Sequence, residues 1–408
     1  MRLPAIAVVT VVAASLGGGA ALGIGKSTGW LDQGTKTVVV RAQAAQPTAL
    51  PASATSKVSA LPGRGFDPQR IFAERSPGVV TIFAYFGDPS SAATSVAQGS
   101  GFVISPKGYV LTNSHVITNA GDGSSVRAAD HLFVEFADGD RAEATVVGWD
   151  LFDDVGLLRL EPSSHRLSPV PLGESAAVVV GEPVAAIGSP LGNDIGVNTL
   201  TVGVVSAIHR SIDAITVQRY KVVDAIQTDA PITHGNSGGP LFDARGRVIG
   251  INAQIRSASG TGNDSGIGFA IPIDAAKHSV AQLISKGKVT YAYVGITTEN
   301  MTPSLARALG YKVEHGALIV GVNGGSPADK AGLHGGNREA HVLGRNLETG
   351  GDVIVAIDGK PVNGADDVVR FVSFSLKPKD VAVLTIVKPG GQRKKVAVTL
   401  AERRLPAG

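Results

Sequence analysis

A long series of short strand-like runs between residues 79 and 271 limits the possible folds more than any other feature of this sequence. Gly, Pro, Asn and Asp separate the runs at short intervals, which leaves too little chain for the crossover helices that parallel strands need. The pattern therefore predicts an antiparallel barrel or sandwich system. The expected strands are Val79–Tyr85, Gly101–Ile104, Tyr109–Thr112, Leu132–Phe136, Ala142–Asp150, Gly156–Leu160, Ala177–Ile187, Val204–Ile208, Val222–Gln227, Pro240–Phe242, Val248–Ile255 and Gly268–Ile271.

A second, smaller unit is expected after this strand-rich region. The run Ile273–Lys286 has helical apolar spacing and ends at Gly287, so it predicts a helix that closes the first domain. The polar, Gly-rich segment 333–352 has no periodicity and is interpreted as a loop insertion. The other expected elements are a helix at Phe66–Arg75, a helix at Ala365–Ser373, and strands at Tyr293–Thr297, Gly316–Val322, Asp352–Ile357, Val381–Val387 and Lys394–Leu400.

Composition excludes several classes of function. The 408 residues include no Cys, which excludes disulfides, thiol catalysis and cysteine-ligated metal sites. The net charge is only +3, and no Lys/Arg block of the kind that binds nucleic acid is present. We therefore expect neither a nucleic-acid partner nor a metal ion or other cofactor.

The N-terminal residues predict a membrane anchor. Residues 3–25 carry no charge, and at about 1.5 Å per residue a helix of this length spans the roughly 30 Å of a bilayer core. We expect a signal anchor, or transmembrane segment, at 1–26. A cleaved signal peptide is the alternative, because Gly18-Gly19-Ala20 offers small residues for cleavage. Residues 27–65, rich in Ala, Pro and Ser, predict a flexible linker, and the remaining chain is expected outside the cytoplasm.

A glycine-flanked serine is the first candidate catalytic residue. Ser237 lies in the segment Gly235-Asn236-Ser237-Gly238-Gly239. Glycines allow a tight turn, a close approach of substrate and accessible backbone N–H groups beside a nucleophilic oxygen. The same residues also suit an ordinary turn, so the interpretation depends on finding a base and an acid elsewhere.

Two other motifs supply those groups. His115 follows one strand-like run and Asp154 precedes another. The order His115, Asp154, Ser237 is the order of a serine-protease triad on a double β-barrel. Ser237 would attack the scissile carbonyl, His115 would accept and return the proton, and Asp154 would orient the imidazole. The N–H groups of Gly235 and Ser237 are expected to form the oxyanion hole.

With these motifs, the sequence resembles the HtrA/DegP family of trypsin-fold serine endopeptidases. The resemblance extends over about residues 70–400. The matching motifs are Thr112-Asn113-Ser114-His115-Val116, Asp150-Leu151-Phe152-Asp153-Asp154-Val155-Gly156, Gly235-Asn236-Ser237-Gly238-Gly239-Pro240-Leu241, Gly99-Ser100-Gly101-Phe102-Val103, Ala186-Ile187-Gly188-Ser189-Pro190, Thr201-Val202-Gly203-Val204-Val205-Ser206 and Gly266-Ile267-Gly268-Phe269-Ala270-Ile271-Pro272.

The resemblance implies a mainly β fold of two domains. Residues 66–288 would form a trypsin-like double six-stranded β-barrel, and residues 290–404 an α+β PDZ domain. The segment Tyr293-Val294-Gly295-Ile296 resembles the carboxylate-binding loop of PDZ domains. Its N–H groups would bind a peptide C-terminus while the peptide adds a strand beside them.

The resemblance also implies an activity and its partners. The chain would be an endopeptidase of the cell envelope that hydrolyses unfolded or damaged proteins in protein quality control and the stress response. The family is commonly trimeric, so a homotrimer or higher multiple is expected through Phe66, Ile71 and Phe72. Small aliphatic residues are expected at the P1 position of the substrate. The implied substrate-binding residues are Ile232 and Ile251 at the P1 pocket, and Asn252, Ala253, Gln254 and Ile255 beside the extended substrate.

Three alternatives remain open at this point. Thr233-His234 replaces the residues that the family commonly has before Gly-Asn-Ser, so His234 is a second histidine near Ser237. The pattern Gly235-x-Ser237-x-Gly239 also satisfies the nucleophile elbow of α/β-hydrolases, although polar residues precede it and a strand-like run follows. A peptide-binding chaperone with little or no peptidase activity is the remaining alternative.

Overall fold

The computed structural model describes residues 65–404 except 92–93, 121–125, 190–197, 214–215, 217–220, 234 and 254–266. The expected anchor at 1–26 and nearly all of the linker at 27–65 lie outside these residues. No helix among the described residues is long and apolar enough to cross a membrane.

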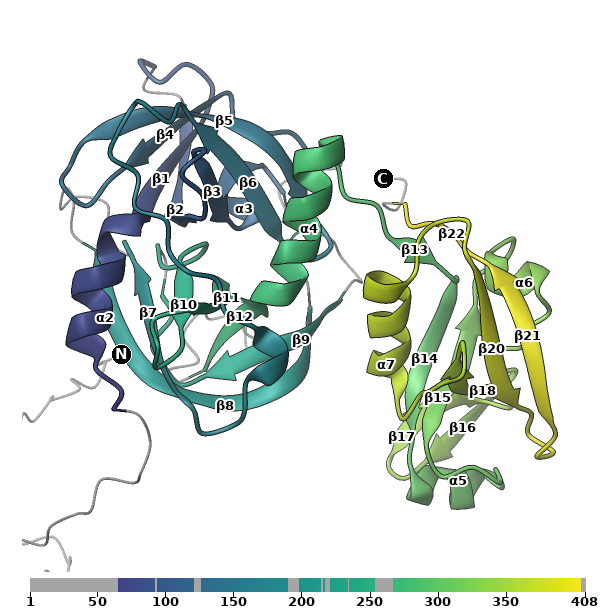
Figure 1. Ribbon diagram of the computed structural model, residues 1–408. Coiled ribbons are helices and arrows are strands. Elements are labelled where there is room, and N and C mark those ends of the chain that lie inside the picture. Colours follow the sequence, from purple (N-terminus) through teal and green to yellow (C-terminus); the bar gives the residue numbers. More distant parts are fainter. Residues whose placement is uncertain are drawn as a thin grey trace, which may run out of the picture. The chain divides into compact units, whose positions relative to one another are not determined.

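Two closed barrels form the first part of the chain (Figure 1). Each has six strands, and neighbouring strands run antiparallel. The first barrel closes in the order β1-β2-β3-β6-β5-β4, and the second in the order β10-β11-β12-β9-β8-β7. Their strands are β1 Val79–Phe86, β2 Ser95–Val103, β3 Tyr109–Thr112, β4 His131–Glu135, β5 Arg141–Asp150, β6 Val155–Leu160, β7 Pro183–Gly188, β8 Thr199–Asp213, β9 Lys221–Thr228, β10 Pro240–Phe242, β11 Val248–Ala253 and β12 Gly268–Pro272.

Burial on both faces explains why these strands contain apolar runs instead of strict alternation. In β6, Leu158 belongs to the core inside the first barrel, while its neighbour Leu157 belongs to a core that both barrels share. Phe242 and Ile251 reach this shared core from the second barrel. A strand that is buried on both faces gains apolar contacts at successive positions.

Two helices pack against this double barrel. Helix α2 (Pro68–Arg75) buries Ile71, and the side chain of Asp67 accepts a hydrogen bond from the Arg70 N–H at its N-terminus. Helix α4 (Ile273–Lys286) packs against β5 and β6 of one barrel and β11 and β12 of the other (Figure 1). It ends as predicted at Gly287, which has a left-handed φ of 70°. Short 3-10 turns lie at Ser76–Gly78 and Ser175–Ala177.

The second part of the chain is a twisted sheet with short helices. Strands β14, β15, β18, β20 and β21 follow one another in the sheet, and β19 adds to β18. Helix α7 packs against β14 and β15, and a π-helical turn at Phe371–Ser375 continues it. The remaining bounds are β13 Ala292–Tyr293, β14 Ile296–Met301, α5 Pro303–Leu309, β15 Gly316–Val322, α6 Pro327–Lys330, β18 Val353–Ile357, β19 Lys360–Pro361, α7 Ala365–Arg370, β20 Val381–Val387, β21 Arg393–Thr399 and β22 Ala401–Glu402.

Our prediction of a loop insertion at 333–352 was wrong. Strands β16 (Arg338–Val342) and β17 (Arg345–Thr349) form an antiparallel hairpin there. The two turn residues, Leu343 and Gly344, have φ values of 52° and 80°. Positive φ at both central positions is the geometry of a type I′ hairpin turn. Leu343 is a poor residue for such a turn, so the sequence carried no recognisable hairpin signal.

A second difference concerns the expected strand 177–187. The strand β7 begins only at Pro183, because Gly181 adopts a left-handed φ of 90° and interrupts the extended backbone. Val179 and Val180, which resemble strand residues, are instead exposed in the preceding turn.

Candidate functional site

His115 lies in the first turn of a short helix that follows β3. Helix α3 spans Ser114–Ile117, and extended backbone at Asn113 makes the change from strand to helix. Val116 and Ile117 are buried, which fixes the helix against the first barrel. The histidine side chain remains 21% exposed, so its ring combines a rigid backbone with access to solvent.

The Asp154 carboxylate holds this histidine. Oδ2 accepts a hydrogen bond from His115 Nδ1 at 2.7 Å, and Oδ1 accepts one from the His115 backbone N–H at 3.0 Å. The Ser114 hydroxyl also donates to Oδ1, at 2.8 Å. Asp154 has a φ of 50° and is 2% exposed. A buried carboxylate that accepts hydrogen bonds from both the ring and the backbone fixes the orientation of the imidazole.

The charge of Asp154 sets the protonation of the histidine. Burial alone would lower the pKa of His115, but the negative charge of Asp154 and its hydrogen bond outweigh burial and raise this pKa above the ordinary value of 6.5. In the neutral ring, a proton on Nδ1 faces Asp154, and Nε2 then carries the lone pair. The ring is therefore prepared to accept a proton at Nε2.

Ser237 lies in a turn that requires glycine at two positions, because any other residue there would be strained. Gly235 and Gly238 have φ values of 94° and 86°. A Cβ on Gly238 would lie 2.2 Å from the carbonyl oxygen of Ser100. The Ser237 carbonyl accepts a hydrogen bond from the Ser100 N–H at 2.8 Å, and the Ser100 hydroxyl donates to the Gly235 carbonyl at 2.6 Å. Strand β2 of the first barrel therefore holds the serine turn of the second barrel.

The same strand brings the serine turn close to the histidine helix. A Cβ on Gly99 would lie 2.7 Å from a methyl group of Val116, the neighbour of His115, and 3.1 Å from the Ser237 carbonyl oxygen. Gly99 therefore fills the narrow space between α3 and the turn that carries Ser237. The turn that carries Ser237 therefore lies beside the helix that carries His115, whose ring is bonded to Asp154.

Some backbone N–H groups of the serine turn are already bonded within the chain. Those of Asn236, Gly238 and Gly239 donate to carbonyls of Thr233, Asn252 and Asn236, respectively. Among the described residues, the Gly235 N–H has no hydrogen-bond acceptor. His234 lies outside the described residues.

The predicted substrate-binding residues differ in accessibility. Ile251 is fully buried in the shared core, and Ile232 is half-buried. The backbone N–H and carbonyl of Asn252 are bonded to Gly239 and Gly238. Ala253 is 4% exposed and pairs with Phe269. Gln254 and Ile255 lie outside the described residues.

The candidate carboxylate-binding loop lies between β13 and β14. The Val294 carbonyl accepts a hydrogen bond from Ala328, and the Gly295 carbonyl accepts one from Asn323, both at 2.9 Å. No acceptor for the Val294 and Gly295 N–H groups is found in the described part of the chain. Gly295 has a φ of 86°, which a glycine tolerates. The loop therefore fixes its carbonyls and leaves adjacent N–H groups available.

Sequence reasoning assigned no role to Ser100 or Ser114, although both support the site. Ser100 bonds the serine turn, and Ser114 bonds Asp154. In the sequence, only their position inside motifs that match the family indicated a possible role for these two serines. Small hydroxyl residues of this kind are difficult to distinguish from turn residues without coordinates.

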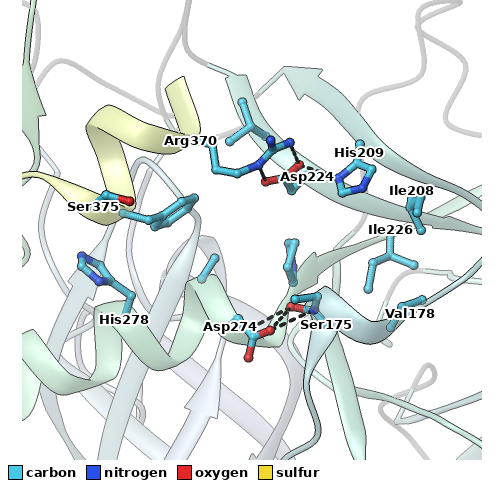
Figure 2. Close-up of a pocket in the computed structure, with 15 residues that line it drawn as sticks. Ser175, Val178, Ile208, His209, Asp224, Ile226, Asp274, His278, Arg370 and Ser375 are labelled. Carbon is cyan, nitrogen blue, oxygen red and sulfur yellow. Dashed lines mark hydrogen bonds and ion pairs between the residues drawn. The ribbon is translucent and has the colours of Figure 1, made fainter. Parts of the chain in front are cut away.

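A cavity of about 640 Å³ has acidic, basic and apolar side chains on its wall (Figure 2). The acidic side chains Asp224 and Asp274 lie on its wall, and Asp224 is paired with Arg370 and His209. His115, Asp154 and Ser237 do not line this cavity. Among the described residues, no group of His, Asp and Glu side chains has an arrangement that would hold a metal ion.

Comparison with known proteins agrees with this architecture. Residues 99–251 match the family model of the trypsin-like peptidase domain, and residues 292–400 match that of the PDZ domain. The first match includes all three candidate catalytic residues. The second begins one residue before the candidate carboxylate-binding loop.

Named relatives match most of the chain. "Protease Do-like 1, chloroplastic" of Arabidopsis thaliana is 37% identical over 81% of this chain and 71% of its own length. A "Probable periplasmic serine endoprotease DegP-like" of Ectopseudomonas mendocina is 39% identical over 74% of this chain, which spans 56% of that longer protein. A solved structure titled "HtrA-type protease AlgW with tripeptide" is 30% identical, with a TM-score of 0.66 over 84% of this chain and 99% of its own. The chain therefore belongs to the HtrA/DegP family of serine endopeptidases, with a trypsin-like peptidase domain followed by one PDZ domain.

Proposed function

We propose that the peptidase activity of this chain uses Ser237 as nucleophile, His115 as general base and acid, and Asp154 as the group that orients His115. The observation that carries the proposal is the pair of hydrogen bonds from His115 to Asp154, at 2.7 and 3.0 Å. They fix both the ring and the backbone of the histidine beside a rigid serine turn. His115 is the proposed base because its ring is bonded to Asp154, and His234 lies outside the described residues.

The proposed reaction has two halves. In the first, Ser237 Oγ attacks the carbonyl carbon of the scissile peptide bond while His115 Nε2 takes the hydroxyl proton. The imidazolium is stabilised by Asp154 and returns the proton to the leaving amine, which leaves an acyl-enzyme. In the second half, water attacks the acyl group with the same proton transfers and regenerates Ser237.

The negative charge that develops on the carbonyl oxygen requires hydrogen-bond donors. We assign this role to the N–H groups of Gly235 and Ser237. The absence of a described acceptor for the Gly235 N–H supports the assignment. Removal of one such donor typically raises the barrier by about 3–4 kcal/mol.

Unfolded or damaged polypeptides are the proposed substrates. An extended substrate strand would pair beside Ala253, Gln254 and Ile255, since the Asn252 backbone is already bonded. Ile232 is the proposed wall of the P1 pocket, while the fully buried Ile251 would support it from the core.

We assign to the PDZ domain the binding of peptide C-termini through Tyr293, Val294, Gly295 and Ile296, for capture of substrates or regulation. The name of the structurally similar AlgW complex, which records a bound tripeptide, supports peptide binding. The terminal position of β14 in its sheet also suits the addition of a peptide strand.

We also propose that the chain acts outside the cytoplasm, anchored by residues 1–26. The uncharged segment 3–25 and the periplasmic designation of the DegP-like relative support this location. A homotrimer remains the proposed assembly. Phe66 and Phe72 are partly exposed, whereas Ile71 is 2% exposed within its own chain, so the two aromatic residues are the better contacts.

Casein digestion by the purified full chain tests the catalytic assignment. Wild type should degrade casein and react with a fluorophosphonate probe, and Ser237→Ala should do neither. Ser285→Ala, on the exposed face of α4, is the matched serine control and should behave as wild type. Equal digestion by wild type and Ser237→Ala would refute the nucleophile. Digestion by neither protein would favour the chaperone alternative.

A further inference from the structure

A buried cluster of acids lies directly beside the turn that carries Asp154. The Tyr291 hydroxyl is 2.5 Å from Asp150 Oδ2 and 2.8 Å from Asp153 Oδ2. The Ser279 hydroxyl donates to the same Asp150 oxygen at 2.7 Å. Asp150 and Tyr291 are each 2% exposed, and Asp153 is 7% exposed. The proposed peptidase mechanism uses none of these groups.

The count of available hydrogens favours an additional proton in this cluster. A tyrosine hydroxyl has one hydrogen and can donate it to only one of two carboxylates. If both acids were ionised, the second contact would place two electron-rich oxygens against each other in a buried site. If one carboxyl is protonated, it donates to the tyrosine oxygen, and the tyrosine donates to the other carboxylate.

The electrostatic environment agrees with this count. Burial, and then the charge of Asp150, raises the pKa of Asp153 to about 7. Burial also raises the pKa of Asp150. Burial and the two carboxylates raise the pKa of Tyr291 well above 10, so its hydroxyl keeps its proton.

Other charged groups near the cluster also affect the ionisation of its members. Arg403 favours the ionised form of Asp153, whereas Asp224 disfavours it. The His278 ring stacks on Tyr291 with centroids 6.1 Å apart. Burial lowers the pKa of His278 against the charge of Asp150, and Lys286 lowers it further.

Both acids belong to one short turn that ends at Asp154. Asp150 is the last residue of β5, and its Oδ1 accepts hydrogen bonds from the N–H groups of Phe152 at 2.9 Å and Asp153 at 3.4 Å. Phe152 packs edge-on against the Tyr291 ring, with centroids 5.6 Å apart. Asp154 then adopts its left-handed φ of 50°. A side chain other than glycine needs support from its surroundings to remain in that conformation.

We propose that Asp150, Asp153 and Tyr291 form a proton-sharing clasp that holds the Asp154 turn, and that Tyr291 is thereby a positioning residue for the peptidase. Tyr291 connects the turn to the segment that follows α4, while Ser279 connects it to α4 itself. The clasp acts through the orientation of Asp154, so the inference rests on the catalytic role proposed for that residue.

Tyr291→Phe in the full chain is the direct test, because it removes one hydroxyl and retains the ring. Displacement of the Asp154 turn should lower kcat for a peptide substrate by about 10- to 100-fold and leave KM within about twofold. The low-field proton resonance of the His115–Asp154 hydrogen bond should shift or disappear. The rate of fluorophosphonate reaction at Ser237 should fall with kcat.

Tyr311→Phe is the matched control. The Tyr311 hydroxyl is also buried and donates to the Gly351 carbonyl at 2.6 Å, but it lies in the PDZ domain without carboxylate partners. This variant should lose thermal stability while its kcat and low-field resonance remain those of wild type. If Tyr291→Phe lowers the melting temperature and leaves kcat and the resonance unchanged, Tyr291 is only structural and the proposal is overturned.

If Tyr291→Phe does not fold, two substitutions of Asp153 provide a second test of the clasp. Asp153→Asn supplies a permanently neutral partner for Tyr291 and should retain kcat within about threefold, whereas Asp153→Ala should lower it as Tyr291→Phe does. Equal kcat for the Asn and Ala variants would overturn the clasp. An active Ser237→Ala would instead refute the underlying catalytic assignment, so the two failures are distinguishable.

Discussion

The Asp154 carboxylate accepts hydrogen bonds from two different parts of His115, its ring Nδ1 and its backbone N–H. The ring bond sets the tautomer, and the backbone bond ties the start of α3 to the β5–β6 turn. Orientation and position of the proposed base therefore depend on the same carboxylate.

Replacement of this carboxylate by an amide should separate catalysis from folding. Asp154→Asn retains the shape of the side chain but favours the wrong histidine tautomer, so we expect kcat to fall by about 10⁴-fold. Circular dichroism should show the native strand content. A kcat within tenfold of wild type would contradict the role of Asp154.

Activity should increase with pH through the ionisation of His115. The charge of Asp154 outweighs burial and raises the pKa of His115, and only the neutral ring accepts a proton. The profile of log kcat/KM against pH should therefore rise to a plateau with an apparent pKa above 6.5. A midpoint below 6.5 would show that another group controls the reaction.

The stability of the folded state should decrease with increasing pH over part of the range in which activity increases. The pKa of Asp153 is raised from 3.8 to about 7 on folding, so between these values the folded state retains a proton that the unfolded state releases. The stabilisation that this proton contributes is therefore fully present below about pH 4 and is lost as the pH rises to about 7. Asp153→Asn removes the ionisation, so its melting temperature relative to wild type should rise over that interval. A constant difference from pH 4.5 to 8 would contradict the raised pKa.

The serine turn should not tolerate a methyl group. Gly238→Ala would force φ = 86° on a non-glycine residue and place Cβ 2.2 Å from the Ser100 carbonyl oxygen. We expect loss of casein digestion and destabilisation by more than the roughly 1–3 kcal/mol of backbone strain alone. Gly287 has a similar φ of 70°, but a Cβ there would meet open space. The Gly287→Ala protein should therefore lose only about 1 kcal/mol of stability and remain active. Denaturant titration and the casein assay separate the two effects.

Peptide binding by the PDZ domain should depend on a free C-terminal carboxylate. Peptides with apolar C-termini should bind, and amidation should weaken binding at least about tenfold, since the N–H groups of the loop would then face a neutral group. Gly295→Ala should abolish binding, because its Cβ would lie 2.3 Å from that of Ser326. Gly310→Ala, with φ = 74° and open space, is the control. Fluorescence anisotropy measures both, and equal affinity for amidated and free peptides would refute the carboxylate site.

Much of the fold was predictable because local patterns and long-range packing agree. β3 and α4 have the predicted limits, since Gly108 and Gly287 provide clear turn and C-cap signals. The β16–β17 hairpin was not predictable, because Leu343 occupies a left-handed position that its side chain disfavours. Propensity describes single residues, whereas this turn is fixed by the pairing of its flanking strands.

Motifs in the sequence suggested candidate catalytic residues, but not the residues that support them. Motif order nominated His115, Asp154 and Ser237, whose neighbourhood the structure then described. The Tyr291 clasp joins residues separated by 141 and 138 positions in the chain. No local pattern connects a tyrosine after one helix with two acids in a distant turn, so only the packed structure identifies the clasp.

Closure of the two barrels has a consequence for a protein that we propose to act on unfolded chains. In each barrel the end strands pair, β1 with β4 and β7 with β10, so among the described strands neither barrel has an unpaired end strand. Free sheet edges are where unfolded chains attach and aggregate. In the PDZ sheet, by contrast, β14 has a strand partner on only one side. The described part of the fold thus leaves an edge at β14 where strand addition can be used for recognition, separate from the substrate strand proposed beside the end of β11.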